Sequence, residues 1–303
     1  MNVLKTVAEA QAVCRSLKRE GKCLGLVPTM GALHEGHLAL VRAARARSQV
    51  VAVSVFVNPL QFGPQEDFSR YPRNFERDCQ LLEAEKVDLI FAPPVDEMYP
   101  QHSQPGTHGK KSGSLGTATF VEVPGLGEKL EGKTRPGHFR GVTTVVSKLF
   151  HIVDPDLAFF GQKDAQQVAI ICRMVRDLNF PLQVVVCPTV RESDGVAMSS
   201  RNAYLDPAHR QVASVLYRAL MRVQALAEGG ECCAATLAEA GRQVIREEPL
   251  ARLDYFEIVH PETFDPVLNV AAGAVVLTAV YFGHTRLIDN VLLHGVASAQ
   301  KPV

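Results

Sequence analysis

The strongest constraint on the fold is a strand, a turn, a helix and a second strand that follow one another between residues 24 and 57. The apolar run Leu24–Val27 predicts a buried strand, and Pro28 and Gly31 predict a turn after it. Apolar side chains at helical spacing then predict a helix over 37–48. The β-branched run Val50–Val57 predicts a strand buried on both faces, which is typical of a parallel sheet.

The same alternation continues from residue 58 to residue 187. Because strands and helices alternate, we predict an α/β fold, with a parallel sheet and crossover helices over residues 1–187. The expected helices are an amphipathic one within 1–17 and others over 73–86, 141–153 and from about 165 to 178; the expected strands are 88–91, 120–123, 157–160 and 183–187.

The pattern changes after Cys187-Pro188, where helices come first and strands follow. We therefore predict a second, smaller α+β domain over residues 188–303. Its expected helices are 207–227 and 232–247, and its expected strands are 255–259, 275–281 and 285–293. Within the first domain, residues 101–119 are rich in Gly, Ser, Thr and Lys and predict a flexible loop.

Composition excludes several classes of protein. The formal net charge of zero argues against a general nucleic-acid binder, because phosphate backbones are held by an excess of Lys and Arg. The seven cysteines lack metal-site spacing, so we expect reduced thiols in a cytoplasmic protein. We find neither a signal-peptide pattern nor about 18 consecutive apolar residues, so no membrane span is expected.

The turn between the first strand and its helix carries His34-Glu35-Gly36-His37. Two imidazoles at this spacing lie on the same side of a helix start, whose backbone N–H groups attract an anion. Imidazoles also donate hydrogen bonds and become charged near neutral pH, which favours a phosphate site. A zinc site is disfavoured, because the His-Glu-x-x-His motif needs a spacing of four residues and no third ligand is evident. Metal ligands remain unassigned.

Three further polar segments are candidate binding sites. Asn58 and Gln61 follow the strand Val50–Val57, at the strand end where open α/β sheets bind ligands. The sequence GQKDAQQ, residues 161–167, forms a second strand–turn–helix site, in which Lys163 can reach a phosphate and Gln167 a polar substrate. In the polar loop 190–202, Ser199, Ser200 and Arg201 offer hydroxyls and a guanidinium to phosphate.

Residues 127–134, GEKLEGKT, match the P-loop consensus G-x-x-x-x-G-K-[ST]. A P-loop must run directly into a helix whose N-terminus holds the phosphates. Here Arg135-Pro136-Gly137 should stop any helix at once. A kinase that uses Lys133 is therefore kept only as an alternative.

Five motifs follow one another along the chain: PTMGALHEGH at 28–37, FVNPLQFG at 56–63, RPGHFRGV at 135–142, FFGQKDAQQ at 159–167 and AMSSRN at 197–202. In this order they make the sequence resemble the pantoate–β-alanine ligase family over residues 3–295. The resemblance implies a Rossmann-like N-terminal domain, a C-terminal lid and a homodimer. A region like 101–119 is shorter in that family, which suggests a surface insertion here.

The resemblance further implies a reaction in which ATP, with Mg²⁺, and pantoate give pantoyl adenylate and pyrophosphate. The amine of β-alanine then attacks the adenylate, releasing pantothenate and AMP. His34, His37, Lys163 and Arg201 match catalytic residues, and Gln61 and Gln167 match pantoate-binding glutamines. Asp78 falls near an acidic stretch associated with metal. The implied ATP-site positions are Met30, His34, His37, Gly161, Lys163, Asp164, Val190, Met198, Ser199, Ser200 and Arg201.

Two other interpretations remain open from the sequence. A nucleotidyltransferase of the same fold would transfer AMP to a different small acid, although the motifs around Gln61 and Gln167 argue against it. A non-catalytic nucleotide-binding module would bind ATP without turnover, although cationic residues in three separate motifs argue against that.

Overall fold

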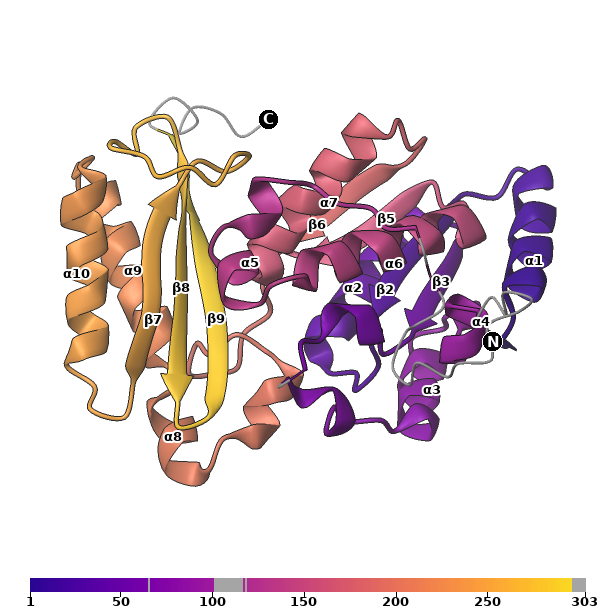
Figure 1. Ribbon diagram of the computed structural model, residues 1–303, viewed down its shortest axis with the longest axis horizontal. Helices are drawn as coiled ribbons and strands as arrows, with labels where there is room; N and C mark the ends of the chain where they lie inside the picture. Colours follow the sequence, from indigo (N-terminus) through magenta and orange to yellow (C-terminus); the bar gives the residue numbers. More distant parts are fainter. Residues whose placement is uncertain (65, 101–116, 118, 296–303) are drawn as a thin grey trace, which may run out of the picture. The chain divides into compact units, whose positions relative to one another are not determined.

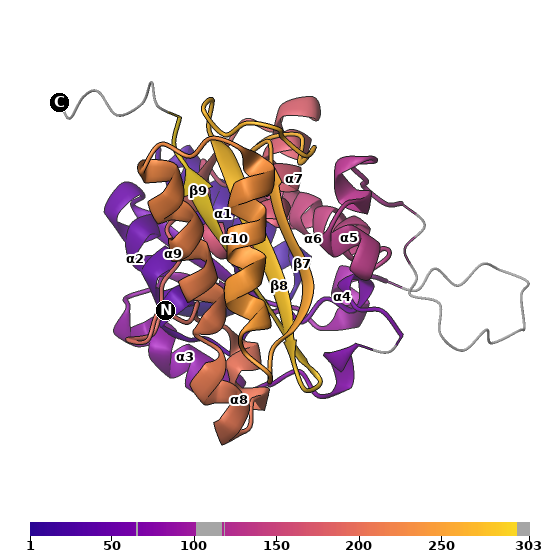
Figure 2. The same cartoon turned by 90° about the vertical axis from the view of Figure 1, so that its left-hand side faces the viewer.

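The computed structural model describes residues 1–64, 66–100, 117 and 119–295 (Figures 1 and 2). Nearly all of the predicted loop 101–119 lies outside this part of the chain. Two compact units are present. The first comprises Met1–Leu33, His37–Phe160 and Ile170–Cys187; the second comprises His34–Gly36, Gly161–Ala169 and the chain from Pro188 onward. Each unit is described by itself.

The first unit is built on a six-stranded sheet with the strand order β1-β4-β3-β2-β5-β6 (Figure 1). The pairs β1–β4, β4–β3, β3–β2 and β2–β5 are parallel, which confirms the predicted fold class. Strand β1, at the sheet edge, was not predicted. The strands are β1 Asn2–Leu4, β2 Leu24–Thr29, β3 Val50–Val55, β4 Leu89–Phe91, β5 Leu157–Gly161 and β6 Gln183–Cys187.

Seven α-helices lie before Pro188 in the described chain. The predicted N-terminal helix starts where Thr6 and Glu9 form a capping box, each side chain accepting from the other residue's backbone N–H. The helices are α1 Val7–Arg19, α2 Glu35–Arg47, α3 Phe75–Ala84, α4 Val95–Met98, α5 Glu131–Thr134, α6 His138–Val153 and α7 Ala165–Asp177.

The strand order reverses at β2 and β5. From β2 the chain moves outward to β3 and β4, whereas β5 pairs on the other side of β2 and leads outward to β6. Apolar side chains such as Val27, Val53 and Phe159 are fully buried in the sheet core. In open α/β sheets, ligands bind beyond the carboxyl ends of the strands at such a reversal. The segments that follow β2 and β5 are therefore the first place to look for a site.

The prediction of a strand over 120–123 is wrong. This segment is irregular, and its backbone bonds to side chains of α6 instead of to another strand. The N–H of Val121 donates to Thr144 Oγ1 at 3.1 Å, and its carbonyl accepts from Thr143 Oγ1. Because two hydroxyls satisfy the backbone groups, the apolar run needs no strand partner.

The second unit contains an antiparallel sheet of three strands, β7 Arg252–Val259, β8 Ala274–Phe282 and β9 Thr285–Leu293. Helices α9 (Val215–Glu228) and α10 (Ala234–Arg246) cover one face of this sheet (Figures 1 and 2). The single helix predicted over 207–227 is two helices. It is interrupted after α8 (Pro207–Val212), where the N–H of Ala213 bonds to the carbonyl of Arg210 three residues earlier.

No helix in the described part of the chain is long and apolar enough to cross a membrane. All seven cysteines are unpaired, as expected for thiols.

Candidate functional site

A buried carboxylate holds the backbone of the loop between β2 and α2. Asp78, in the first turn of α3, accepts from the backbone N–H of Ala32 at 3.0 Å and of Leu33 at 2.9 Å. At the end of β2, Thr29 donates to the carbonyl of Ser54 on β3 at 2.7 Å. Asp78 was expected near a metal-associated stretch, but its two oxygens bind this loop. Its observed contacts hold the backbone of the two residues that precede His34 in the chain.

His34 is kept neutral by its surroundings. Burial, assisted by the positive charge of Lys163, lowers the pKa of His34 to about 4. Its Nδ1 accepts from the backbone N–H of Gly36 at 3.2 Å, so the proton of the neutral ring is on Nε2. The expectation of an imidazole charged near pH 7 is therefore corrected: His34 offers a neutral donor. His37 lies on α2, two residues after the helix begins at Glu35.

Lys163 lies in a short turn between β5 and α7. The turn is the 3₁₀ segment Gln162–Asp164, and α7 follows at once with Gln167 in its first turn. The Lys163 ammonium is 3.5 Å from the carboxylate of Asp164, and four-fifths of its side chain is buried. Gly161 ends β5, and a Cβ at that position would meet nothing within 4 Å. The predicted strand–turn–helix arrangement is thus present.

The polar loop 190–202 is a hairpin followed by a 3₁₀ turn. Arg191 and Ala197 form an antiparallel bridge, and the N–H of Met198 donates to the carbonyl of Val190 at 3.0 Å. Ser199 caps the turn Ser200–Tyr204, because its Oγ accepts from the N–H of Arg201 at 3.2 Å. That bond leaves the hydroxyl hydrogen of Ser199 to donate elsewhere.

The second unit brings several predicted ATP-site residues together. The charges of Lys163, Asp164 and Glu192 all act on the His34 ring. A Cβ placed on Gly36 would lie 3.6 Å from Cβ of Met198. The segments that follow β2 and β5 and the 190–202 loop therefore meet around His34, and the positive charge of Lys163 lies close to its ring.

The predicted substrate residues of the first unit form a buried network. Asn58 donates to Gln61 Oε1 at 3.1 Å and to the carbonyl of Gly141 at 3.0 Å, and it accepts from the hydroxyl of Tyr99 at 2.8 Å. Gln61 Nε2 lies 2.9 Å from the sulfur of Met30. Asn58 is 1% exposed, so in this arrangement its side chain holds Gln61 in place.

The motif RPGHFRGV supports Gln61 from the other side, a role that the sequence analysis missed. The carbonyl of Gln61 accepts from His138 Nδ1 at 2.8 Å, so Nε2 of that ring accepts from Arg135 at 3.1 Å. Arg135 also binds both carboxylate oxygens of Glu66. Burial, with Arg135 nearby, lowers the pKa of His138 to about 4 and keeps it neutral. One signal could have revealed this role: the polar motif RPGHFRGV lies at the start of a predicted helix, yet the sequence analysis gave its residues no chemical function.

A glycine on α6 allows this helix to approach Gln61. A Cβ on Gly141 would lie 2.3 Å from the carbonyl oxygen of Leu60 and 2.6 Å from the N of Gln61. Any larger residue would therefore displace the loop that carries Gln61.

The P-loop pattern at 127–134 has a structural explanation. It spans the turn Leu126–Glu128 and the single helical turn of α5, and neither Lys133 nor Thr134 is buried. A Cβ on Gly132 would lie 1.9 Å from the carbonyl oxygen of Gly127. The second glycine of the pattern therefore serves a close backbone contact. The pattern does not run directly into a long helix, because α5 ends at Thr134 and α6 begins only at His138.

No group of three or more His, Cys, Asp or Glu side chains that could hold a metal ion occurs among the described residues. Within that part of the chain there is no protein-only metal cage.

Comparison with known proteins agrees with the fold and the motifs. The strand reversal and the polar segments beyond β2 and β5 are typical of an α/β protein with a ligand site at its sheet edge. The family model of pantoate-beta-alanine ligase matches residues 2–292. The chain belongs to the pantoate–β-alanine ligase family of enzymes.

Its relatives match along their whole lengths. The pantothenate synthetase of Koribacter versatilis is 59% identical, with 100% of this chain and 99% of the relative covered. A crystal structure of pantothenate synthetase from Thermus thermophilus is 51% identical, with a TM-score of 0.87 over 96% of this chain and 99% of that one. A pantoate-beta-alanine ligase from Francisella tularensis, complexed with beta-gamma ATP and beta-alanine, is 32% identical, with a TM-score of 0.76 over 96% and 97%.

Proposed function

We propose that this protein condenses pantoate with β-alanine through a pantoyl-adenylate intermediate, and that it releases AMP and pyrophosphate. Family membership and the Francisella ligase complexed with beta-gamma ATP and beta-alanine support the substrates. The observation that carries the chemistry is the grouping of His34 with Lys163 and Met198 beyond the reversal of the sheet.

In the first step, a carboxylate oxygen of pantoate attacks the α-phosphorus of ATP and pyrophosphate leaves. A carboxylate needs no general base, so the main demand is to position the reactants and neutralise developing charge. We assign that role to Lys163, His34, His37 and Arg201, with the hydroxyls of Ser199 and Ser200 on the triphosphate. His34 acts as a neutral Nε2–H donor. The other ATP-lining residues are Met30, Gly161, Asp164, Val190 and Met198.

Pantoate is assigned to Gln61 and Gln167, and Asn58 is assigned to positioning Gln61. The Nε2 group of Gln61 is bonded to a thioether, which is a weak acceptor. Exchanging that contact for a pantoate oxygen therefore costs little. The carbonyl of Gln61 stays bound to His138, so its backbone remains in place when the side chain changes partner.

Mg²⁺ would supply charge neutralisation on the triphosphate. It commonly binds through substrate phosphates, waters and only one or two carboxylates. An ion bound in this way would arrive together with ATP. We further propose that the protein forms a homodimer, which sedimentation would test. We also propose that residues 188–303 act as a lid, which would limit hydrolysis of the adenylate.

Isotope transfer tests the proposed chemistry. Pantoate labelled with ¹⁸O in its carboxylate is incubated with ATP, Mg²⁺, β-alanine and the purified protein. Adenylate chemistry predicts one labelled oxygen in AMP, together with pyrophosphate. Formation of ADP, or of AMP without label, would contradict the proposal.

A further inference from the structure

Two adjacent residues on β9, Asp289 and Asn290, have buried side chains that no step of the proposed reaction uses. Each is 3% exposed. Successive residues of a strand point to opposite faces of the sheet, so the two side chains serve different partners. Asp289 faces the side of α9, where Leu287 and Leu293 also lie in the core, and Asn290 faces the other side.

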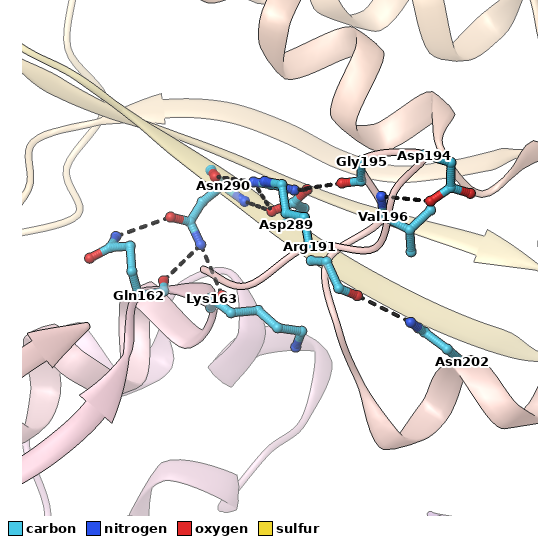
Figure 3. A network of polar contacts seen from close by, with 10 residues as sticks. Gln162, Lys163, Arg191, Asp194, Gly195, Val196, Asn202, Asp289 and Asn290 are labelled. Atoms are coloured by element: carbon cyan, nitrogen blue, oxygen red, sulfur yellow. Dashed lines mark hydrogen bonds and ion pairs between the residues drawn. The ribbon is translucent and has the colours of Figure 1, made fainter. Parts of the chain in front are cut away.

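Asn290 binds the turn that carries Lys163. Its Nδ2 donates to the carbonyls of Gln162 and Lys163, both at 2.9 Å, and its Oδ1 accepts from Gln162 Nε2 at 3.0 Å (Figure 3). Only an amide can make this set of bonds, because two carbonyls need two donors and the Gln162 amide needs an acceptor. The Lys163 side chain extends away from Asn290 in Figure 3, so Asn290 fixes its backbone and leaves its ammonium for other contacts.

Asp289 binds the loop that leads to Ser199–Arg201. Both of its oxygens accept from Arg191, at 2.6 and 3.0 Å, and Arg191 also donates to the carbonyl of Gly195 at 3.0 Å (Figure 3). The Arg191 guanidinium lies over the ring of Tyr217 on α9, 4.5 Å from its centroid. The N–H of Asn290 donates to Asp289 Oδ1 at 2.8 Å, so the two clamps are joined.

We propose that Asn290 is a positioning residue for Lys163, and that β9 aligns the Lys163 turn with the 190–202 loop through Asn290 and Asp289. This inference rests on the proposed function, because it takes Lys163 to act on the reacting phosphate. One rigid strand thus sets the spacing of two phosphate-binding segments that are about 30 residues apart in the chain. Misplacement of a reacting group by about 1 Å can cost about 100-fold in rate.

A double-mutant cycle on pantoate-dependent exchange of pyrophosphate into ATP tests the proposal. Asn290→Ala should lower kcat for exchange about 10- to 100-fold, with KM for pantoate changed less than about 2-fold, because the side-chain bonds of Asn290 go to Gln162 and Lys163 and not to the pantoate residues Gln61 and Gln167. Lys163→Ala should lower kcat about 1,000-fold. The double variant should resemble Lys163→Ala alone, because Asn290 acts through Lys163.

Further variants separate positioning from folding. Asn290→Asp should be worse than Asn290→Ala, because a carboxylate oxygen then faces two carbonyls, whereas Asn290→Ser should fall between Ala and wild type. The matched control is Asn269→Ala. Asn269 is an exposed asparagine of the same unit, and its Oδ1 accepts from the backbone N–H of Ala271 in its own loop. This substitution should change kcat less than about 2-fold. Melting curves check that each variant is folded.

The possible outcomes distinguish a failure of this inference from a failure of the proposed function. Losses that multiply in the double variant, or an unchanged kcat in a folded Asn290→Ala variant, would overturn this inference while the wild type still exchanges. If the Asn290→Ala variant does not fold, the same comparison is made with the Asn290→Ser variant. No exchange by the wild-type protein would instead contradict the proposed function and this inference with it.

Discussion

Two segments of this chain place a lysine after a glycine-containing turn, and they differ in what surrounds them. Residues 127–134 satisfy the P-loop consensus but lie in a 3₁₀ turn and a four-residue helix. Residues 161–167 match no general consensus, yet they follow a sheet strand and lead into the 13-residue helix α7. In open α/β sheets, phosphate groups typically bind beyond a strand end and at a helix N-terminus, so suitable residues must also lie in that setting. Structural context, more than the letter pattern, separates these two lysines.

The largest expected difference is catalytic. Lys163→Ala should lower kcat for pantothenate formation about 1,000-fold, because the proposed site loses the positive charge that we assign to the reacting phosphate. Lys133→Ala should change kcat less than about 2-fold, because Lys133 is exposed and lies on a single helical turn. Steady-state kinetics of both variants check this. Comparable losses of kcat in the two variants would contradict the proposed difference between the two segments.

The next difference concerns the glycines of the P-loop pattern. Gly132→Ala should lower the free energy of unfolding by about 3 kcal/mol, because its Cβ would overlap the carbonyl oxygen of Gly127. Gly127→Ala, whose Cβ would be 3.7 Å from Phe139, should cost less than about 0.5 kcal/mol. Urea unfolding measures both. A loss of ATP affinity without a loss of stability would favour a true P-loop.

The smallest expected difference is electrostatic. Removing Lys163 should raise the pKa of His34 from about 4 toward its ordinary value, because a nearby positive charge is gone. Removing Lys133 should leave that pKa unchanged. NMR titration of the imidazole protons gives both values. A His34 pKa insensitive to Lys163 would mean that the two groups are not neighbours.

The same titration has a consequence for stability. The folded pKa of His34 is below 6.5, so the unfolded chain binds a proton between about pH 6.5 and 4 that the folded chain does not. Stability should therefore fall as pH falls through this window, and His138 adds to the loss. The loss should be smaller in Lys163→Ala, as unfolding curves at pH 7 and 5 would show.

Local patterns predicted most of the fold. The βαβ unit from 24 to 57, the strands 157–160 and 183–187 and the three C-terminal strands each carry their signal within a few residues. The absent strand at 120–123 shows the limit, because the hydroxyls that satisfy Val121 come from α6, more than 20 residues later. Edge strand β1 has only three residues and too little pattern to recognise.

The residues of the candidate site could be predicted where they lie in a sequence motif. The residues that hold those motifs in place could not. His34, Lys163 and Met198 belong to recognisable segments, and the second unit brings them together. Asp78 and Asn290 support the His34 and Lys163 segments from distant parts of the chain, and His138 supports Gln61 in the same way; all three bind backbone groups, which any sequence possesses. The neutral state of His34 was also hidden, because burial is a property of the fold.

The most direct test of the central claim is pantoate-dependent exchange of labelled pyrophosphate into ATP without β-alanine, measured for wild type, Lys163→Ala and Lys133→Ala. The account predicts exchange in the wild-type protein and in Lys133→Ala, and about 1,000-fold slower exchange in Lys163→Ala. Exchange that survives the loss of Lys163 but not of Lys133, or that does not depend on pantoate, would contradict it.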